Sequence, residues 1–463
     1  RDLYLMDTET KKESLLKKQE QDLIRGFSWA NDERILYLQD KGGDENYHVY
    51  GVDINGANDK ELTPFEGVRV NIIESLKEDK EHIIIQMNKD NPQQEEPYRL
   101  NINSGEITKL YTVKEGEPPV AGYDFDREGN LRAISRIVDG VNTELLYKID
   151  GEFKLVKLTE FGDEFGISSF NPGSANPDDA YVISNLEGDK IEIQLYDLKK
   201  NKKINTVFSN DTYDVSGMAL SKKRNYEIDY FSYTGEKTQI IPVSDTYKKI
   251  YNRLKQEFGD KQFFTVGRTD DESKYMVAVT SDKIVGEYYL YDVEADEISL
   301  LYKLLPHLKE EDMASMKPIT FKSRDGLTLH GYITLPHSYQ EGMQVPLVVN
   351  PHGGPQGIRD SWGFNPEAQL FASRGYATLH VNFRISGGYG KEFLKAGFGE
   401  IGRKAMDDVE DGVDYVIEQG WVDKDRIAIY GGSHGGYAVL RGMTKTPEKY
   451  ACGVDYVGVS NLN

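Results

Sequence analysis

Residues 426–441 read RIAIYGGSHGGYAVLR, and this segment sets the architecture of the C-terminal third of the chain. Arg426 to Tyr430 is a short apolar run typical of a buried strand, and the residues from Tyr437 onward suit a helix. Between them, Gly431, Ser433 and Gly435 form the pattern G-x-S-x-G. Because the pattern joins a strand to a helix, it predicts a tight turn that exposes the Ser433 hydroxyl above a sheet.

The segments around this turn alternate between strand and helix patterns. We predict a hairpin around the turn Ser323–Gly326, because apolar runs flank it on both sides. The further elements that the pattern predicts are strands at 346–350, 376–382, 426–430 and 450–460, and helices at 368–374 and 403–419. This alternation predicts a mostly parallel sheet, the framework of an α/β-hydrolase domain.

The turn at Ser433 is suited to nucleophilic catalysis. Glycines on either side permit the strained backbone that the turn requires, and the N-terminus of the following helix favours negative charge. The bare G-x-S-x-G pattern is a weak signal, and a structural Gly-Ser turn is the alternative. Its position between a strand and a helix favours Ser433 as a nucleophile, with Gly431 and Gly435 shaping the turn.

Acyl transfer also needs donors for the negatively charged oxygen of its tetrahedral intermediate. This fold takes one donor from the residue after the nucleophile and another from the loop after an earlier strand. The backbone N–H of His434 is the first candidate, and we interpret its imidazole as incidental. The second loop, residues 350–355, reads NPHGGP, and we expect its donor from Gly353 or, next to it, Gly354. A plain glycine turn is the alternative.

The first 305 residues repeat a short signature of an apolar residue, a tyrosine and then an Asp or Asn. Its tyrosines are Tyr4, Tyr50, Tyr98, Tyr147, Tyr196 and Tyr291. They lie 46, 48, 49, 49 and 95 residues apart, and the last gap is nearly two periods. The run Ile241–Asp245 stands where the missing copy is expected. Seven units of about 48 residues, rich in short strands, predict a β-propeller of about seven four-stranded blades, with the tyrosines as packing residues.

These patterns divide the chain into a propeller at 1–305, a charged linker at 306–316 and a partial catalytic domain at 317–463. The chain begins at Arg1 inside an apparent strand. We therefore expect an incomplete first blade and a natural N-terminus upstream, where a signal peptide would be unseen. The compartment stays open between the cytoplasm and export to the periplasm.

Composition excludes several classes of partner. The chain has 56 Lys and Arg against 77 Asp and Glu, a net charge of −21, which would repel nucleic acid and anionic membranes. No apolar stretch approaches the roughly 20 residues that span a bilayer, so we predict a soluble protein without membrane insertion. Cys452 is the single cysteine and lies in an apolar run, which predicts a buried thiol and no internal disulfide. His48, His82 and His307 have no partners at ligand spacing, so we predict no metal and no cofactor.

Three motifs resemble those of the prolyl oligopeptidase family of serine peptidases. They are PHGGP at 351–355, NFRISGGYG at 382–390 and GGSHGGY at 431–437, and they look most like the acylaminoacyl-peptidase and dipeptidyl-peptidase 5 branch. The resemblance implies hydrolysis of short peptides, with the propeller excluding folded proteins. It also implies Ser433 as nucleophile and the amides of His434 and Gly353 as oxyanion donors. The sequence does not decide between release of acyl-amino acids and release of dipeptides, nor does it give the side-chain preference or the oligomeric state.

The catalytic acid and base should follow the serine in this fold, in the order Ser, Asp or Glu, His. Only 30 residues follow Ser433, so we expect both partners to lie outside this chain and the chain by itself to be inactive. Two alternatives remain for the complete protein. One is a carboxylesterase of the same fold, and the other is a propeller binding module with a vestigial hydrolase domain.

Overall fold

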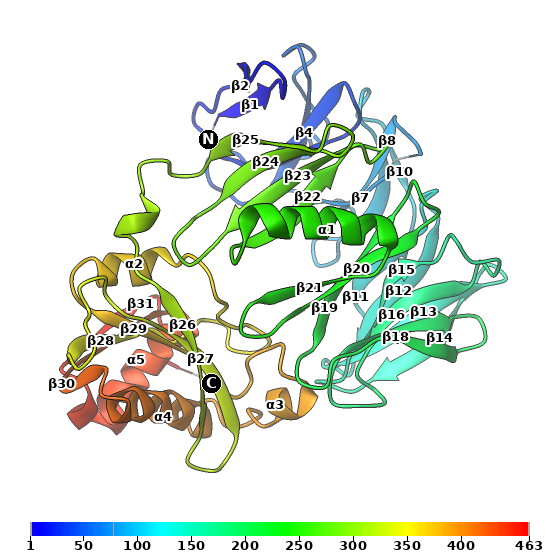
Figure 1. Ribbon diagram of the computed structural model, residues 1–463. Helices are drawn as coiled ribbons and strands as arrows, with labels where there is room; N and C mark the ends of the chain where they lie inside the picture. Colours follow the sequence, from blue (N-terminus) through cyan, green and yellow to red (C-terminus); the bar gives the residue numbers. More distant parts are fainter. Residues whose placement is uncertain (1, 77, 462–463) are drawn as a thin grey trace.

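The computed structural model describes residues 2–76 and 78–461 (Figure 1). Within these ranges, a two-stranded sheet and six blades of three or four antiparallel strands follow one another along residues 3–303. The two-stranded sheet contains β1 (Leu3–Met6) and β2 (Glu13–Lys17). The next two blades contain β3 (Ile24–Trp29), β4 (Arg34–Gln39), β5 (His48–Asp53) and β6 (Lys60–Glu61), then β7 (Val70–Ser75), β8 (His82–Met87), β9 (Glu96–Asn101) and β10 (Ile107–Lys109).

The remaining four blades continue in chain order. They contain β11 (Val120–Phe125), β12 (Leu131–Val138), β13 (Asn142–Ile149) and β14 (Glu152–Thr159), then β15 (Phe165–Phe170), β16 (Asp179–Ser184), β17 (Glu192–Asp197) and β18 (Lys202–Phe208). After these come β19 (Val215–Ser221), β20 (Glu227–Thr234) and β21 (Thr238–Pro242), and finally β22 (Gln262–Arg268), β23 (Lys274–Thr280), β24 (Glu287–Asp292) and β25 (Glu297–Lys303). The predicted propeller is confirmed, and the two-stranded sheet stands where an incomplete first blade was expected.

The repeated tyrosines mostly fill the blades, as predicted. Tyr98, Tyr147, Tyr196 and Tyr291 are at most 5% exposed. Tyr4 and Tyr50 are the exceptions. The strand of Tyr4 belongs to the two-stranded sheet and 52% of its surface is exposed, and Tyr50, in β5 of a full blade, is only partly buried. The tyrosine period therefore marks a buried packing position in four of its six copies.

One blade departs from the predicted four strands. The sheet β19–β21 is followed by helix α1 (Asp245–Phe258), which runs across the front of the propeller in Figure 1. The Ser244 hydroxyl caps this helix by accepting a hydrogen bond from the backbone N–H of Tyr247, at 3.0 Å. Tyr247, Ile250 and Leu254 are spaced three and four residues apart and are buried. A helix therefore takes the place of the fourth strand in this blade, and the tyrosine period did not predict it.

The second part of the chain is a six-stranded sheet with the order β26-β27-β29-β28-β30-β31. Its strands are β26 (Met316–Lys322), β27 (Thr328–Thr334), β28 (Val345–Val349), β29 (Ala377–Asn382), β30 (Val422–Gly432) and β31 (Cys452–Tyr456). Its helices are α2 (Pro366–Ala372), α3 (Lys391–Lys395), α4 (Lys404–Glu418) and α5 (His434–Lys445), with short 3-10 turns η1 (Glu310–Asp312) and η2 (Pro447–Lys449). Strands β29, β28, β30 and β31 pair in parallel, whereas β26 and β27 form the predicted hairpin. The α/β-hydrolase framework is confirmed, and the division of the chain at 306–316 stays a prediction.

The sheet contacts one edge of the propeller. The backbone N–H of Asp214, just before β19, donates to the carbonyl oxygen of Gly388 at 3.1 Å, and its carboxylate accepts from the N–H of Gly390 at 3.0 Å. Asp163, just before β15, pairs with Lys395 at 2.7 Å. The loop 384–390 and helix α3 therefore rest on the edge where these propeller strands begin.

The prediction of a buried Cys452 is wrong, because the thiol is exposed. Its strand β31 pairs with β30 alone among the described strands, and all five of its residues are exposed. No helix in the described part of the chain is long and apolar enough to cross a membrane.

Candidate active site

Ser433 lies at the sharp turn between β30 and α5, at the carboxyl end of the parallel strands. Its backbone has φ 55° and ψ −124°, a strained conformation for a residue with a side chain. Its N–H donates to the carbonyl oxygen of Tyr456 at 3.3 Å, and its own carbonyl accepts from Tyr437 at 3.1 Å. These two bonds hold the strained turn between β31 and α5, while the side chain stays exposed.

Two glycines let the strand, the helix and the loop after β28 come together at this turn. A Cβ on Gly431 would lie 2.6 Å from the backbone carbonyl carbon of Gly435. A Cβ on Gly435 would overlap the carbonyl oxygen of Pro351. No larger residue fits either position without moving backbone. The close approach of the three segments therefore depends on Gly431 and Gly435.

The loop that follows β28 places Gly353 beside Ser433. A Cβ on Gly353 would lie 3.6 Å from the Cβ of Ser433 and make no closer contact. Gly354 is exposed, has φ +112° and would meet Ile358 instead. Of the two glycines proposed from the sequence, Gly353 is therefore the one adjacent to the serine.

His434 is the first residue of α5, and its imidazole is buried. The ring lies between Phe383 and Tyr437, with centroid distances of 5.6 Å to each. Neither ring nitrogen has a hydrogen-bond partner in the described part of the chain, and burial lowers the pKa of His434 to about 4. The imidazole is therefore neutral at physiological pH and is a packing group at this position.

His352 fixes the loop that carries Gly353. Its Nδ1 lies 2.7 Å from the Gly353 carbonyl oxygen, and its Nε2 lies 2.9 Å from the Ser386 hydroxyl. A carbonyl only accepts, so Nδ1 carries the proton, and burial lowers the pKa of His352, which leaves Nε2 to accept from Ser386. The ring also stacks on Phe383 at 4.4 Å. The motif at 382–390 had signalled the family, but only the structure shows that it supports this loop.

Arg384, in the same motif, holds that support in place. It is 3% exposed and makes paired hydrogen bonds to Asp408, which is fully buried, at 2.7 and 2.8 Å. Asp325, in the predicted hairpin turn, accepts from it at 2.8 and 3.0 Å. The backbone N–H of Arg384 also donates to Asp408 at 2.8 Å. The sequence offered no signal for this network, because its three members are far apart along the chain.

The structure brings together some of the groups that acyl transfer needs. Ser433, Gly353 and the start of α5 at His434 meet at one edge of the sheet. Within residues 2–76 and 78–461, the Ser433 hydroxyl makes no hydrogen bond to an imidazole or a carboxylate. The same ranges contain no cluster of three or more His, Cys, Asp or Glu residues that could hold a metal ion.

The described residues thus combine a propeller with the sheet of an α/β-hydrolase fold, and a strained serine lies where the parallel strands of that sheet end. Residues 362–463 match the prolyl oligopeptidase family. The dipeptidyl aminopeptidase BIII of Pseudoxanthomonas mexicana is 32% identical over 460 residues, which cover 95% of this chain and 64% of that protein. The acylamino-acid-releasing enzyme of Sus scrofa is 34% identical over 138 residues, 30% of this chain and 19% of that protein.

Among solved structures, a puromycin-hydrolyzing peptidase of Mycobacterium tuberculosis has the same fold. It superposes with a TM-score of 0.72 at 17% identity, over 98% of this chain and 73% of that one. These matches confirm the resemblance carried by the three motifs: residues 362–463 match the prolyl oligopeptidase family, and 95% of the chain is similar to the dipeptidyl aminopeptidase BIII. It spans 64% of the length of its bacterial relative.

Proposed function

We propose that this chain is the larger part of a serine peptidase that hydrolyses short peptides through an acyl-enzyme on Ser433. The observation that carries the proposal is the strained, exposed serine beside Gly353 at the carboxyl ends of the parallel strands. One of the relatives is a dipeptidyl aminopeptidase and another is an acylamino-acid-releasing enzyme. Either activity is compatible with the site described above.

In the proposed reaction, a general base removes the proton of the Ser433 hydroxyl as its oxygen attacks the peptide carbonyl carbon. The backbone N–H groups of His434 and Gly353, with Gly354 as the alternative, stabilise the oxyanion. The base then protonates the leaving amine, and water hydrolyses the ester in the reverse sequence. We infer that the histidine base and its carboxylate partner lie in a part of the protein beyond these residues, because no described residue fills either role.

We propose no metal or cofactor for this reaction, since a serine nucleophile and two backbone donors supply the required chemistry. The substrates are short peptides, because a propeller that covers the hydrolase sheet restricts access to chains of small cross-section. The net charge of −21 supports the expectation that nucleic acid is not a partner.

A carboxylesterase is the second candidate, because the same turn and loop would serve an ester. The test is turnover by the whole protein of peptide substrates and of matched p-nitrophenyl esters. A higher kcat/KM for blocked or free dipeptidyl substrates than for esters without a peptide supports the peptidase. Markedly better turnover of the simple esters would contradict it.

A substitution at Ser433 distinguishes a peptidase from a binding module with a vestigial hydrolase domain. Ser433→Ala should abolish peptide turnover by the whole protein without changing its thermal unfolding. Gly26→Ala is a matched control, because a Cβ at Gly26 meets no atom within 4 Å. Absence of turnover in the unsubstituted whole protein would favour the binding module.

A further inference from the structure

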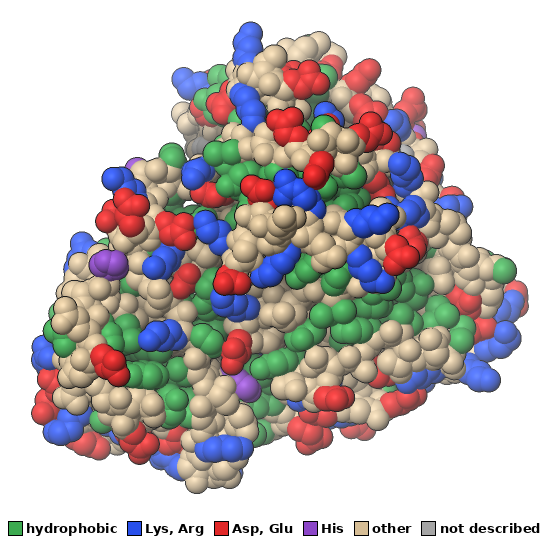
Figure 2. All heavy atoms as spheres, viewed as in Figure 1, with side chains coloured by type: hydrophobic (Ala, Val, Ile, Leu, Met, Phe, Trp, Pro, Cys, Tyr) green, Lys and Arg blue, Asp and Glu red, His purple; other side chains and the backbone are tan. Residues whose placement is uncertain are grey.

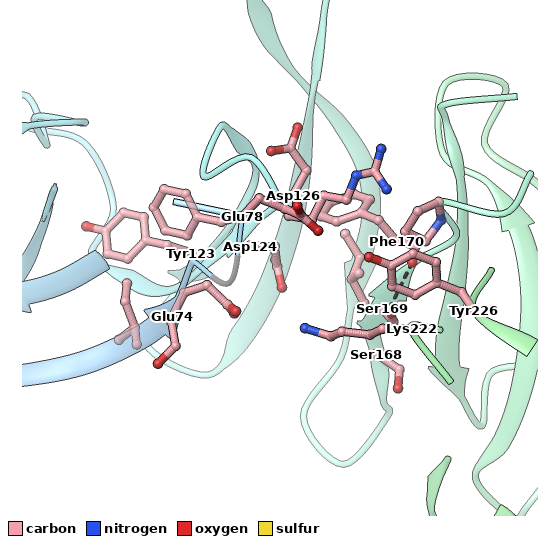
Figure 3. A pocket seen from close by; sticks show the side chains of 16 residues that line it. Glu74, Glu78, Tyr123, Asp124, Asp126, Ser168, Ser169, Phe170, Lys222 and Tyr226 are labelled. Atoms are coloured by element: carbon pink, nitrogen blue, oxygen red, sulfur yellow. Dashed lines mark hydrogen bonds between the residues drawn. The ribbon is translucent and has the colours of Figure 1, made fainter. Parts of the chain in front are cut away.

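A cavity of about 370 Å³ lies in the propeller where the first strands of four successive blades end (Figure 3). It is lined by the ends of β7, β11 and β15 and by the turn after β19. Volumes at the lower end of the range for ligand sites suit a small molecule rather than a folded partner. The charges on its walls therefore determine which small molecule it could bind.

The cavity is remote from Ser433. Strands β15 and β19 begin at Phe165 and Val215, next to the residues that contact the hydrolase sheet. The cavity residues Ser169 and Lys222 lie at the opposite ends of these strands. At about 3.3 Å per residue, strands of six or seven residues put the cavity about 20 Å beyond those contacts. It opens at the end of the propeller that faces away from the hydrolase sheet.

Glu74 and Asp124 are two of the carboxylates that line one side of the cavity. Neither Glu74 nor Asp124 makes a hydrogen bond or ion pair with another described residue. Glu74 is exposed to solvent and Asp124 is partly buried. Partial desolvation raises the pKa of Glu74, and it raises the pKa of Asp124 to about 6. By contrast, Asp126 in the same wall accepts hydrogen bonds from Asn130 and pairs with Arg132. Glu74 and Asp124 thus hold negative charge that no described residue neutralises by a hydrogen bond or ion pair.

The opposite side of the cavity carries a cation. Figure 3 shows the side chains of Glu74, Asp124 and Lys222 directed into the same space from different blades. The ammonium of Lys222 acts on Glu74 by lowering its pKa, against the effect of burial. A cavity with two carboxylates facing a lysine offers separate places for a positive and a negative group.

We propose that this cavity is a second binding site, for a zwitterion of the size of a free amino acid or dipeptide. The ligand ammonium would lie between Glu74 and Asp124, and its carboxylate would lie against Lys222. A bound metal ion fits the cavity less well, because Lys222 would repel it and no described metal-binding cluster includes these residues. The site does not depend on the proposed peptidase activity.

The test is isothermal titration calorimetry of this chain with alanyl-alanine, N-acetyl-alanyl-alanine and alanyl-alanine amide. We expect one site for the free dipeptide and affinities about tenfold or more weaker for each blocked form, because each loses a charge-assisted contact. These three ligands test both ends of the site on the unsubstituted protein. No measurable binding of the free dipeptide, or equal affinities for all three, would overturn the proposal.

Two variants assign the ends of the ligand. In Glu74→Gln/Asp124→Asn, acetylation should no longer weaken binding, and in Lys222→Gln, amidation should no longer do so. Glu152→Gln is the control, because it removes one exposed charge on β14 outside the cavity. Dipeptide affinity that is unchanged in both variants would place the ligand elsewhere, such as beside Ser433, and would refute the site. Thermal unfolding measurements check that each variant is folded. If a variant is not folded, the comparison of the three ligands on the unsubstituted protein still tests the site.

Discussion

Substitution of Asp408 should destabilise the hydrolase part of the chain far more than substitution of Asp325. Both carboxylates pair with Arg384, but Asp408 is fully buried and Asp325 is 36% exposed at its side chain. Asp408→Ala leaves a buried guanidinium and the Arg384 backbone N–H without their main acceptor. Loss of one partner of a buried pair costs about 3–5 kcal/mol, and we expect about 3 kcal/mol because the contacts with Asp325 remain. Asp325→Ala, at the solvent side, should cost about 1 kcal/mol.

The assay is urea unfolding followed by tryptophan fluorescence. Two of the three tryptophans, Trp362 and Trp421, lie in the second part of the chain, so the signal reports mainly on the hydrolase sheet. The double variant Arg384→Met/Asp408→Leu should be less destabilised than Asp408→Ala, because no buried charge is left unpaired. Equal costs for Asp408→Ala and Asp325→Ala, or a cost below about 1 kcal/mol for Asp408→Ala, would refute this reasoning.

Three further predictions concern the turn, a buried acid and the blades. Gly435→Ala should lower kcat of the whole protein by about 100-fold, because a displacement of about 1 Å in a catalytic site has that effect, while Gly26→Ala should leave kcat unchanged. Equal kcat in the two variants would contradict the close packing described above. Burial raises the pKa of Asp360 to about 7, so the folded state favours the protonated carboxyl. The stability that the protonated Asp360 contributes is therefore lost as pH rises from about 4 through about 7. Asp360→Asn should therefore gain stability relative to the unsubstituted chain between about pH 5 and about pH 8 in thermal unfolding, and a constant difference would argue against a buried, neutral carboxyl. Tyr147→Ala should cost about 3–5 kcal/mol in urea unfolding, whereas Tyr4→Ala, at an exposed position, should cost well under 1 kcal/mol.

The propeller and the parallel sheet could be predicted because each repeats a local pattern. Tyr98 and Tyr147 recur at the blade period because their blades bury the same position. Helix α1 escaped prediction because its three buried residues interrupt the period with a helical spacing. The exposure of Cys452 depends on which elements cover β31, and an apolar run does not give that information.

The positions of Ser433 and Gly353 in the candidate site could be predicted, because short motifs encode local turns. The contacts that hold these turns in place could not be predicted. Arg384, Asp408 and Asp325 meet only after strands and helices have folded, and Ser386 reaches His352 across two loops. Such long-range contacts leave no periodic trace in one sequence.

The most direct test of the account is labelling of the whole protein with a fluorophosphonate probe, followed by peptide mapping. We predict a single adduct on Ser433, together with loss of both the adduct and peptide turnover in Ser433→Ala. An adduct on another serine, or peptide turnover that survives in Ser433→Ala, would contradict it.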